Sequence, residues 1–141
     1  MSNSDNPING KQFQNQVIEW LKNEYNCSFY DEKEIAIGNP KKSHKFDIVD
    51  ENNTIAIECK RCTWTEAGNV PSAKLGLCNE AVFFLSFLPD EFDKYLVMLK
   101  STHARRSETL AEYYFRRYSH LLTGVKVAEY DPEKKLLKAI E

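Results

Sequence analysis

Three charged residues have the types and the spacing that suit metal-assisted hydrolysis. Asp47 lies inside one short apolar segment, and Glu58-Cys59-Lys60 ends the next one. An acidic residue two positions before a lysine is a weak signal in a chain this charged, and the same pattern recurs at Asp31/Lys33 and Glu133/Lys135. Those two copies lie in charged, turn-like stretches. Only the copy at Glu58 ends a predicted strand, so we select Asp47, Glu58 and Lys60 as the candidate catalytic residues.

The two segments that carry these residues are predicted to form a β-hairpin. Residues 44–50 and 54–60 are rich in β-forming residues, and Asn52-Asn53 between them can adopt the positive φ of a tight turn. A two-residue turn and a four-residue loop both place Asp47 directly opposite Glu58. Cβ atoms of directly opposed residues are roughly 4.5–5.5 Å apart, and Lys60 shares the face of Glu58 because strand side chains alternate. Two carboxylates and one ammonium are therefore expected on one patch.

Opposed carboxylates repel each other, so this patch needs a compensating charge. Mg²⁺ is a natural candidate, because it binds one or two carboxylates together with waters and a substrate phosphate. Such an ion can acidify a bound water and neutralise charge on a phosphate, while a nearby lysine stabilises the same charge. The alternative is a surface ion cluster of Asp, Lys and Glu that contributes little energy. Spacing alone leaves both interpretations open.

A family resemblance favours the metal site. Phe46-Asp47-Ile-Val, followed after Asp47 by ten residues and then by Glu58-Cys59-Lys60, resembles the core motif of the PD-(D/E)XK nuclease superfamily, which includes restriction endonucleases and Holliday-junction resolvases. The resemblance implies a Mg²⁺-dependent endodeoxyribonuclease, with Mn²⁺ as a substitute, DNA as the substrate and no small-molecule cofactor. It implies that Asp47, Glu58 and the Cys59 backbone carbonyl bind the metal and that Lys60 is catalytic.

The sequence departs from the family pattern at two positions. Phe46 replaces the proline that often precedes the aspartate. On the first helix, Gly10, Phe13, Val17 and Leu21 fit the resolvase-like pattern, but Gln14 stands where a glutamate is usual. Gln14 and Lys74, which resembles a polar helix position of some members, are auxiliary site candidates. The neutral Gln14 also motivates a second hypothesis, a nuclease-fold module that binds nucleic acid or a protein partner without cleaving.

The predicted elements can position these residues. In order, they are a helix over 11–25, a strand over 34–37, the hairpin strands 44–50 and 54–60, a helix from about 72, a strand over 95–99, a helix from an N-cap at Ser107 to about 123, a strand over 125–130 and a short last element. Part of 81–88 could instead be a strand. This order predicts a single α/β domain with an αβββαβ restriction-endonuclease-like core, a mixed central sheet flanked by helices, and a C-terminal helix and strands. Residues 1–9 are expected to be a flexible tail and 10–141 the domain.

Charge and cysteine content add weaker signals. Net charge is −2, but residues 94–126 hold seven basic residues against two acidic ones. Within that segment Arg105, Arg106, Arg116 and Arg117 are candidates for binding DNA phosphates, the alternative being a solvated face. Cys59 and Cys62 form a C-x-x-C pair, which raises a zinc or redox hypothesis, but a structural zinc needs four ligands and no second pair exists. Core packing of these thiols is favoured.

Composition sets the remaining expectations. The longest apolar run is far shorter than a membrane helix, and the first residues lack an export signal, so a cytoplasmic location with reduced cysteines and no membrane partner is expected. A homodimer would supply the two active sites that a double-strand cut requires.

Overall fold

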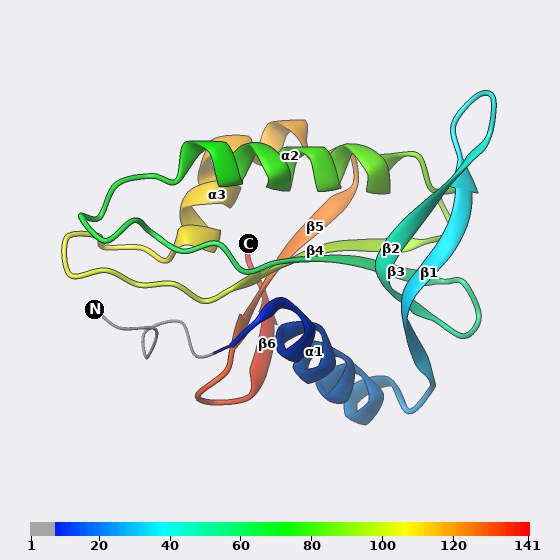
Figure 1. Cartoon of the computed structure of the whole chain (residues 1–141), viewed down its shortest axis with the longest axis horizontal. Coiled ribbons are helices and arrows are strands. Elements are labelled where there is room, and N and C mark those ends of the chain that lie inside the picture. Colours follow the sequence, from blue (N-terminus) through cyan, green and yellow to red (C-terminus); the bar gives the residue numbers. More distant parts are fainter. Residues whose placement is uncertain (1–7) are drawn as a thin grey trace.

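Helices pack around one central sheet (Figure 1). The computed structural model describes residues 8–141. Its elements are α1 (Gly10–Tyr25), β1 (Phe29–Ile37), β2 (Lys42–Asp50), β3 (Ile55–Lys60), α2 (Ser72–Ser86), β4 (Asp93–Leu99), α3 (Leu110–Tyr118), a 3-10 turn (Ser119–Leu121), β5 (Val125–Asp131) and β6 (Leu136–Ala139). Of the predicted tail, residues 1–9, the first seven lie outside the described residues. Its last two residues join the fold, because Ile8 is buried and the Asn9 side chain caps α1.

The six strands lie in sequence order across a mixed sheet. β1, β2 and β3 pair antiparallel, β3, β4 and β5 pair parallel, and β6 returns antiparallel to β5. Parallel pairing requires crossover connections, which α2 and α3 provide. The predicted α/β class, the αβββαβ core and the mixed sheet are confirmed.

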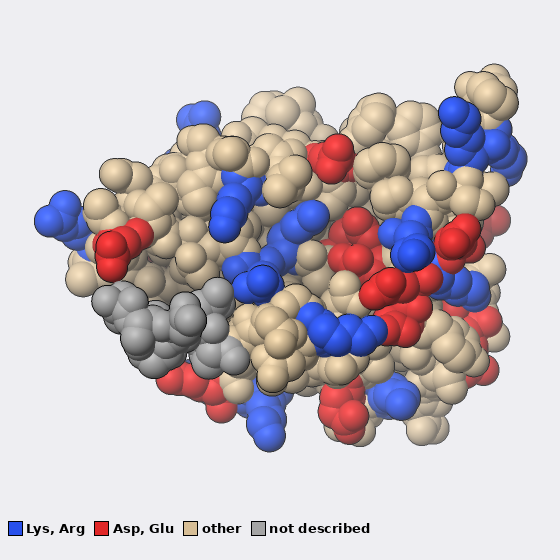
Figure 2. Space-filling model, viewed as in Figure 1, with Lys and Arg blue, Asp and Glu red and all other residues tan. Residues whose placement is uncertain are grey.

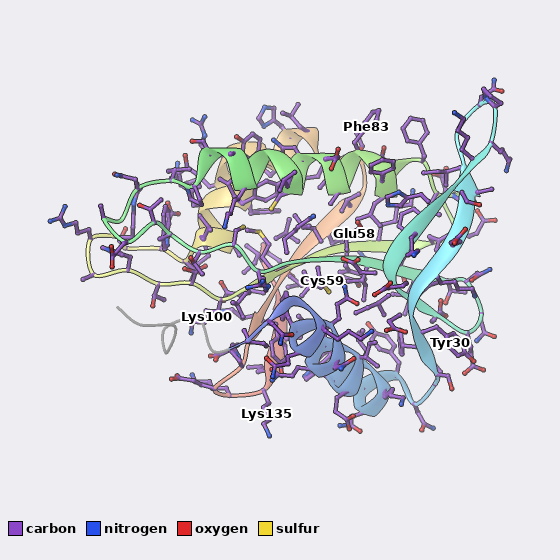
Figure 3. The ribbon with its side chains drawn as sticks, viewed as in Figure 1. Tyr30, Glu58, Cys59, Phe83, Lys100 and Lys135 are labelled. Carbon is purple, nitrogen blue, oxygen red and sulfur yellow. The ribbon has the colours of Figure 1, made fainter. Side chains whose placement is uncertain are left out.

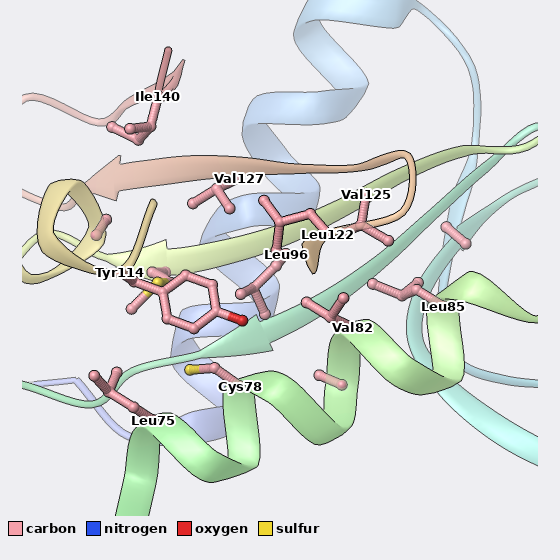
Figure 4. Packing of buried hydrophobic residues seen from close by; sticks show 14 of the residues in the cluster. Leu75, Cys78, Val82, Leu85, Leu96, Tyr114, Leu122, Val125, Val127 and Ile140 are labelled. Atoms are coloured by element: carbon pink, nitrogen blue, oxygen red, sulfur yellow. The ribbon is translucent and has the colours of Figure 1, made fainter. Parts of the chain in front are cut away.

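Helices cover both faces of the sheet, α1 on one and α2 with α3 on the other (Figure 1). The apolar face of α1, Phe13, Val17 and Leu21, packs on Ile48 and Ile57. On the opposite face, α2 and α3 enclose a larger cluster with Leu96, Tyr114 and Val127 (Figure 4). No helix within residues 8–141 combines the length and apolarity that a bilayer crossing requires.

The boundaries of several elements differ from the prediction. Residues 81–86 belong to α2 rather than to a strand. β1 begins at Phe29, well before the predicted residue 34. The N-cap of α3 is Thr109, not Ser107: Thr109 Oγ1 accepts the Glu112 N–H, while the Glu112 side chain accepts the Thr109 N–H. This capping box requires a glutamate three positions after the cap, which Thr109 has and Ser107 lacks.

β1 and β2 both change face at one position of their ladder. Phe46 packs on the α2 side of the sheet and Ile48 on the α1 side, although a regular strand would place both on one face. Pairing runs through Asp31–Ile48 and Lys33–Phe46, so Glu32 lies opposite Asp47 between them. Glu32 has φ +53°, a left-handed conformation that is uncommon for a residue other than glycine. The β1–β2 ladder is therefore irregular at Glu32 and Asp47.

Candidate active site

The predicted register of the β2–β3 hairpin is confirmed around the site. Ile48 pairs with Ile57 and Val49 with Ala56, and the next positions outward are Asp47 and Glu58. A four-residue connection joins the strands, with Asn53 at φ +55°. The Asp50 carboxylate stabilises this connection by accepting the N–H groups of Thr54 (2.6 Å) and Ile55 (2.8 Å). The turn thereby fixes the register that opposes the two acidic residues.

Beyond Ile48 and Ile57, side chains replace the backbone ladder between the strands. Asp47 donates its N–H to Glu58 Oε2 at 2.9 Å, and Asp47 Oδ2 accepts the N–H of Cys59 at 2.8 Å. Each carboxylate is thus held by the opposite strand. Among residues 8–141, no hydrogen-bond donor reaches the second oxygen of either carboxylate, so one oxygen of each carboxylate is left for a ligand.

The backbone of Cys59 offers a third oxygen. In a strand, the N–H and C=O of one residue point to the same neighbour. Because the Cys59 N–H points at Asp47, its carbonyl lies on the same edge of β3. The Cys59 side chain lies on the opposite face of the sheet from Glu58 (Figure 3). Two carboxylates and one carbonyl are the oxygen ligands that Mg²⁺ prefers.

Both carboxyl groups have raised pKa values, and burial is the largest cause for each. Burial, and then the Asp47 charge, raise the pKa of Glu58 to about 8. Burial likewise raises the pKa of Asp47, although the Cys59 N–H and the Lys60 ammonium oppose that rise. Lys60 therefore lies within electrostatic reach of both carboxylates. The structure brings the three predicted catalytic residues together. The Lys60 charge does not fully offset the effects that raise the pKa values of the two carboxyl groups.

His44, which sequence reasoning did not select, lies next to this pair. Its ring stacks on Phe84 with a centroid distance of 3.9 Å, and its Nε2 lies 3.9 Å from Glu58 Oε1. Nε2 is buried and has no hydrogen-bond partner among residues 8–141. Burial lowers the pKa of His44, so the ring is neutral at pH 7. The change of face in β2 brings His44 onto α2, and alternation alone could not reveal that contact.

Lys60 lines a basic cavity of about 280 Å³. Lys74, the auxiliary candidate on α2, lines the same cavity, as does Arg61. Arg61 also reaches back toward the N-terminal segment, where its Nη1 is 3.4 Å from the Ile8 carbonyl oxygen. In one view of the surface, acidic and basic side chains lie next to each other between α1 and α2 (Figure 2). This distribution favours a local site for an anionic group rather than a uniformly basic face.

Gln14 lies half-buried on α1, and its Oε1 is buried without a hydrogen-bond partner in the described part of the chain. Within residues 8–141, no three His, Cys, Asp or Glu side chains are placed to bind one metal ion together. The charges of two further acidic residues reach the pair: Glu32, opposite Asp47, raises the Asp47 pKa, and Glu80 on α2 raises the Glu58 pKa. The Glu32 side chain also faces a lysine, and Glu32 Oε2 lies 3.9 Å from Lys11 Nζ. Any metal bound here would thus rely on two carboxylates, the backbone and solvent.

The four candidate DNA-binding arginines divide into two groups. Arg106 is half-buried, stacks 4.3 Å from the Trp64 ring and donates to the Gly68 carbonyl at 2.8 Å. Arg116 forms a two-pronged ion pair with Glu108. Both therefore hold loops in place. The other two, Arg105 and Arg117, are exposed.

The element order and the mixed sheet give this chain a restriction-endonuclease-like fold. Two solved structures share the fold: an XisH family protein from Nostoc punctiforme (TM-score 0.54, 19% identity, 89% of this chain and 97% of that one) and a FdxN element excision controlling factor protein from Anabaena variabilis (TM-score 0.52, 15% identity, 90% of this chain and 97% of that one). No family model and no curated protein matches the chain. At these identities the likeness shows the fold alone.

Proposed function

We propose that this protein is a Mg²⁺-dependent nuclease that hydrolyses phosphodiester bonds in DNA. The pair of Asp47 and Glu58 carries the proposal. Each carboxylate accepts an N–H from the strand of the other and keeps one oxygen free, and the Lys60 charge acts on both. A surface ion cluster would not explain a buried Glu58 and a half-buried Asp47 whose pKa values are both raised by burial. Buried charges are costly unless a counter-charge is supplied, and a divalent cation supplies one.

Each residue of the site would have a separate role. Asp47, Glu58 and the Cys59 carbonyl would hold the cation, which supplies Lewis-acid polarisation of the phosphate oxygens. Lys60 would neutralise charge that develops on the phosphate and orient the attacking water. Lys74 and Arg61, which line the same cavity, would bind the phosphate on either side of the reacting bond. Glu58 must lose its proton before it binds the cation, so cation affinity should rise with pH up to about 8.

The test is cleavage of supercoiled plasmid, single-stranded and branched DNA with Mg²⁺ or Mn²⁺, against EDTA. Lys60→Ala should lower the cleavage rate by about 100-fold or more, the typical effect of losing one group that stabilises transition-state charge. Asp47→Asn should abolish metal-dependent cleavage. Lys135→Ala is the matched control and should cleave normally, because Lys135 belongs to an acidic–lysine pair in the turn after β5. Absence of cleavage, or cleavage that these variants do not alter, contradicts the proposal.

A second candidate is a module that binds DNA or a partner without cleaving it. Gln14 in place of a first-helix glutamate favours this function, as does the absence of a third metal-binding side chain among residues 8–141. One fold neighbour is named as a controlling factor for element excision, which would suit such a module. This candidate predicts salt-dependent DNA binding without turnover, and Arg105→Ala should weaken that binding.

A further inference from the structure

Two cysteines from separate segments meet beside the candidate active site. Cys62 lies in the loop that leaves β3 two residues after Lys60, and Cys78 lies on α2. Their sulfur atoms are 3.9 Å apart. A disulfide needs an S–S distance of about 2.05 Å, so a sulfur displacement of about 2 Å would join them. The C-x-x-C motif joins Cys59 to Cys62 and does not reveal this pair, because Cys78 lies 16 positions after Cys62.

The two thiols differ in access. Cys62 is partly buried and lines the basic cavity with Lys60 and Lys74. Cys78 is fully buried in the cluster that includes Leu75 and Tyr114 (Figure 4). The hydrogen bond with Cys78 lowers the pKa of the Cys62 thiol, helped by the Lys74 charge, while the same bond and burial raise the pKa of Cys78. Cys62 is therefore the thiol that a small oxidant reaches in its reactive form.

The other cysteines cannot take the place of this pair. Cys59 packs with the α1-side cluster, whereas Cys62 packs with the α2-side cluster. The sheet thus separates the two members of the C-x-x-C motif. Burial, together with the charge of Asp47, raises the pKa of the Cys59 thiol. Cys27 also belongs to the α1 side.

We propose that Cys62 and Cys78 form a reversible disulfide when the protein meets hydrogen peroxide. The Cys62 thiolate attacks one peroxide oxygen, the O–O bond breaks, and a sulfenic acid and hydroxide result. The Cys78 sulfur then attacks the Cys62 sulfur, an S–S bond forms, and the second hydroxide leaves. The two thiol protons convert both hydroxides to water, so two thiols and one peroxide give one disulfide and two waters. In a reducing compartment such a bond is transient and redox-sensing.

The bond would link the loop after β3 to α2 at the wall of the basic cavity. Cys62, which follows Lys60 on the same chain segment, would move toward Cys78 on α2, and α2 also lines the cavity through Lys74. Closing a loop between residues 62 and 78 also restricts the unfolded chain. The oxidised protein should therefore melt several degrees above the reduced one.

Tryptic mapping of the intact chain tests the pairing, because each cysteine falls in its own peptide: residues 23–33 (Cys27), 46–60 (Cys59), 62–74 (Cys62) and 75–94 (Cys78). Reduced protein is desalted, treated with one equivalent of hydrogen peroxide, blocked with iodoacetamide and digested without reductant. The expected product is one cross-linked species joining 62–74 to 75–94, with a loss of two hydrogen masses from the intact protein. Dithiothreitol should restore both peptides.

Variants separate the pair from general oxidation. Cys62→Ser should abolish the intact-mass loss and the rise in melting temperature, while Cys27→Ser and Cys59→Ser should retain both. Cys78→Ala should leave Cys62 as a sulfenic acid that dimedone traps. If Cys78→Ala does not fold, the comparison of Cys62→Ser with the wild type still tests the pairing. A 46–60/62–74 cross-link, an intermolecular dimer, or oxidation of Cys62 to sulfinic acid without a cross-link would overturn the proposal.

Discussion

Replacing Glu58 by glutamine should stabilise the protein at neutral pH while removing a metal ligand. In the folded protein, burial and the Asp47 charge raise the Glu58 pKa from its ordinary 4.5 to about 8. Between those values the folded state holds a proton that the unfolded state has released. Stability therefore falls as pH rises through this window, by about 1.4 kcal/mol for each pH unit. The accumulated loss is about 3 kcal/mol at pH 7 and is absent below pH 4.

Glu58→Gln is nearly isosteric and keeps an oxygen that can accept the Asp47 N–H. It does not ionise, so it avoids the loss. Urea unfolding followed by tryptophan fluorescence at pH 4, 6, 7 and 8.5 in EDTA measures the difference. At pH 7 the midpoint of Glu58→Gln should exceed that of the wild type by on the order of 1–2 M urea, and at pH 4 the two should agree. Glu133→Gln, in the exposed turn after β5, is the control and should show no pH-dependent difference.

Mg²⁺ provides a second comparison with the same two proteins. A cation that binds only the folded state stabilises it in proportion to the logarithm of its concentration. At pH 7, saturating Mg²⁺ should raise the wild-type midpoint and leave that of Glu58→Gln nearly unchanged. A Glu58→Gln protein that is less stable than the wild type at pH 7, or a difference that does not vary with pH, would refute the assignment of Glu58 as a buried, uncompensated carboxyl.

Three further predictions concern the surroundings of the site. Arg106→Ala should destabilise the fold by about 1–2 kcal/mol, because the bond to the Gly68 carbonyl and the stack on Trp64 are lost; Arg105→Ala should change urea stability little, and equal losses would contradict the division of the arginines. Thr109→Ala should cost about 1 kcal/mol of unfolding free energy and Ser107→Ala nothing measurable, since only Thr109 caps α3. Peroxide-treated protein should cleave DNA more slowly than reduced protein and recover with dithiothreitol, whereas Cys62→Ser should respond to neither reagent.

Much of the fold could be predicted because its signals are local. The apolar spacing along α1 and the β-rich segments on either side of the Asn52-Asn53 turn each act within a few residues. The turn then fixes the hairpin register, and the register alone places Asp47 against Glu58. The element order followed from these signals, and the order supported the family resemblance. Where a prediction failed, as at the N-cap of α3, a competing local signal with a better-placed partner was present at Thr109.

Contacts made by α2 could not be predicted in the same way. The C-x-x-C spacing brings Cys59 and Cys62 close in sequence, but the strand and the loop after it send them to opposite faces of the sheet. The partner of Cys62 is set by how α2 crosses that face, which no pattern of nearby residues records. Lys74 entered the prediction only through family resemblance, and the same helix placement brings it to the cavity of Lys60.

The irregular ladder at Asp47 explains why the site forms at this point of the hairpin. In a regular β2 the Asp47 N–H would point to β1, because Ile57 and Cys59 face β2 and Ile48, the partner of Ile57, therefore faces β3. The left-handed Glu32 on the neighbouring strand coincides with a change of face in β1 and β2, and the Asp47 N–H binds the Glu58 side chain instead. The same change turns Phe46 and His44 toward α2, where His44 stacks on Phe84 beside the Glu58 carboxylate. The irregular position at Glu32 thus occurs together with three features of the site: a free oxygen on each carboxylate, the stack of His44 on Phe84, and the burial that raises the Glu58 pKa.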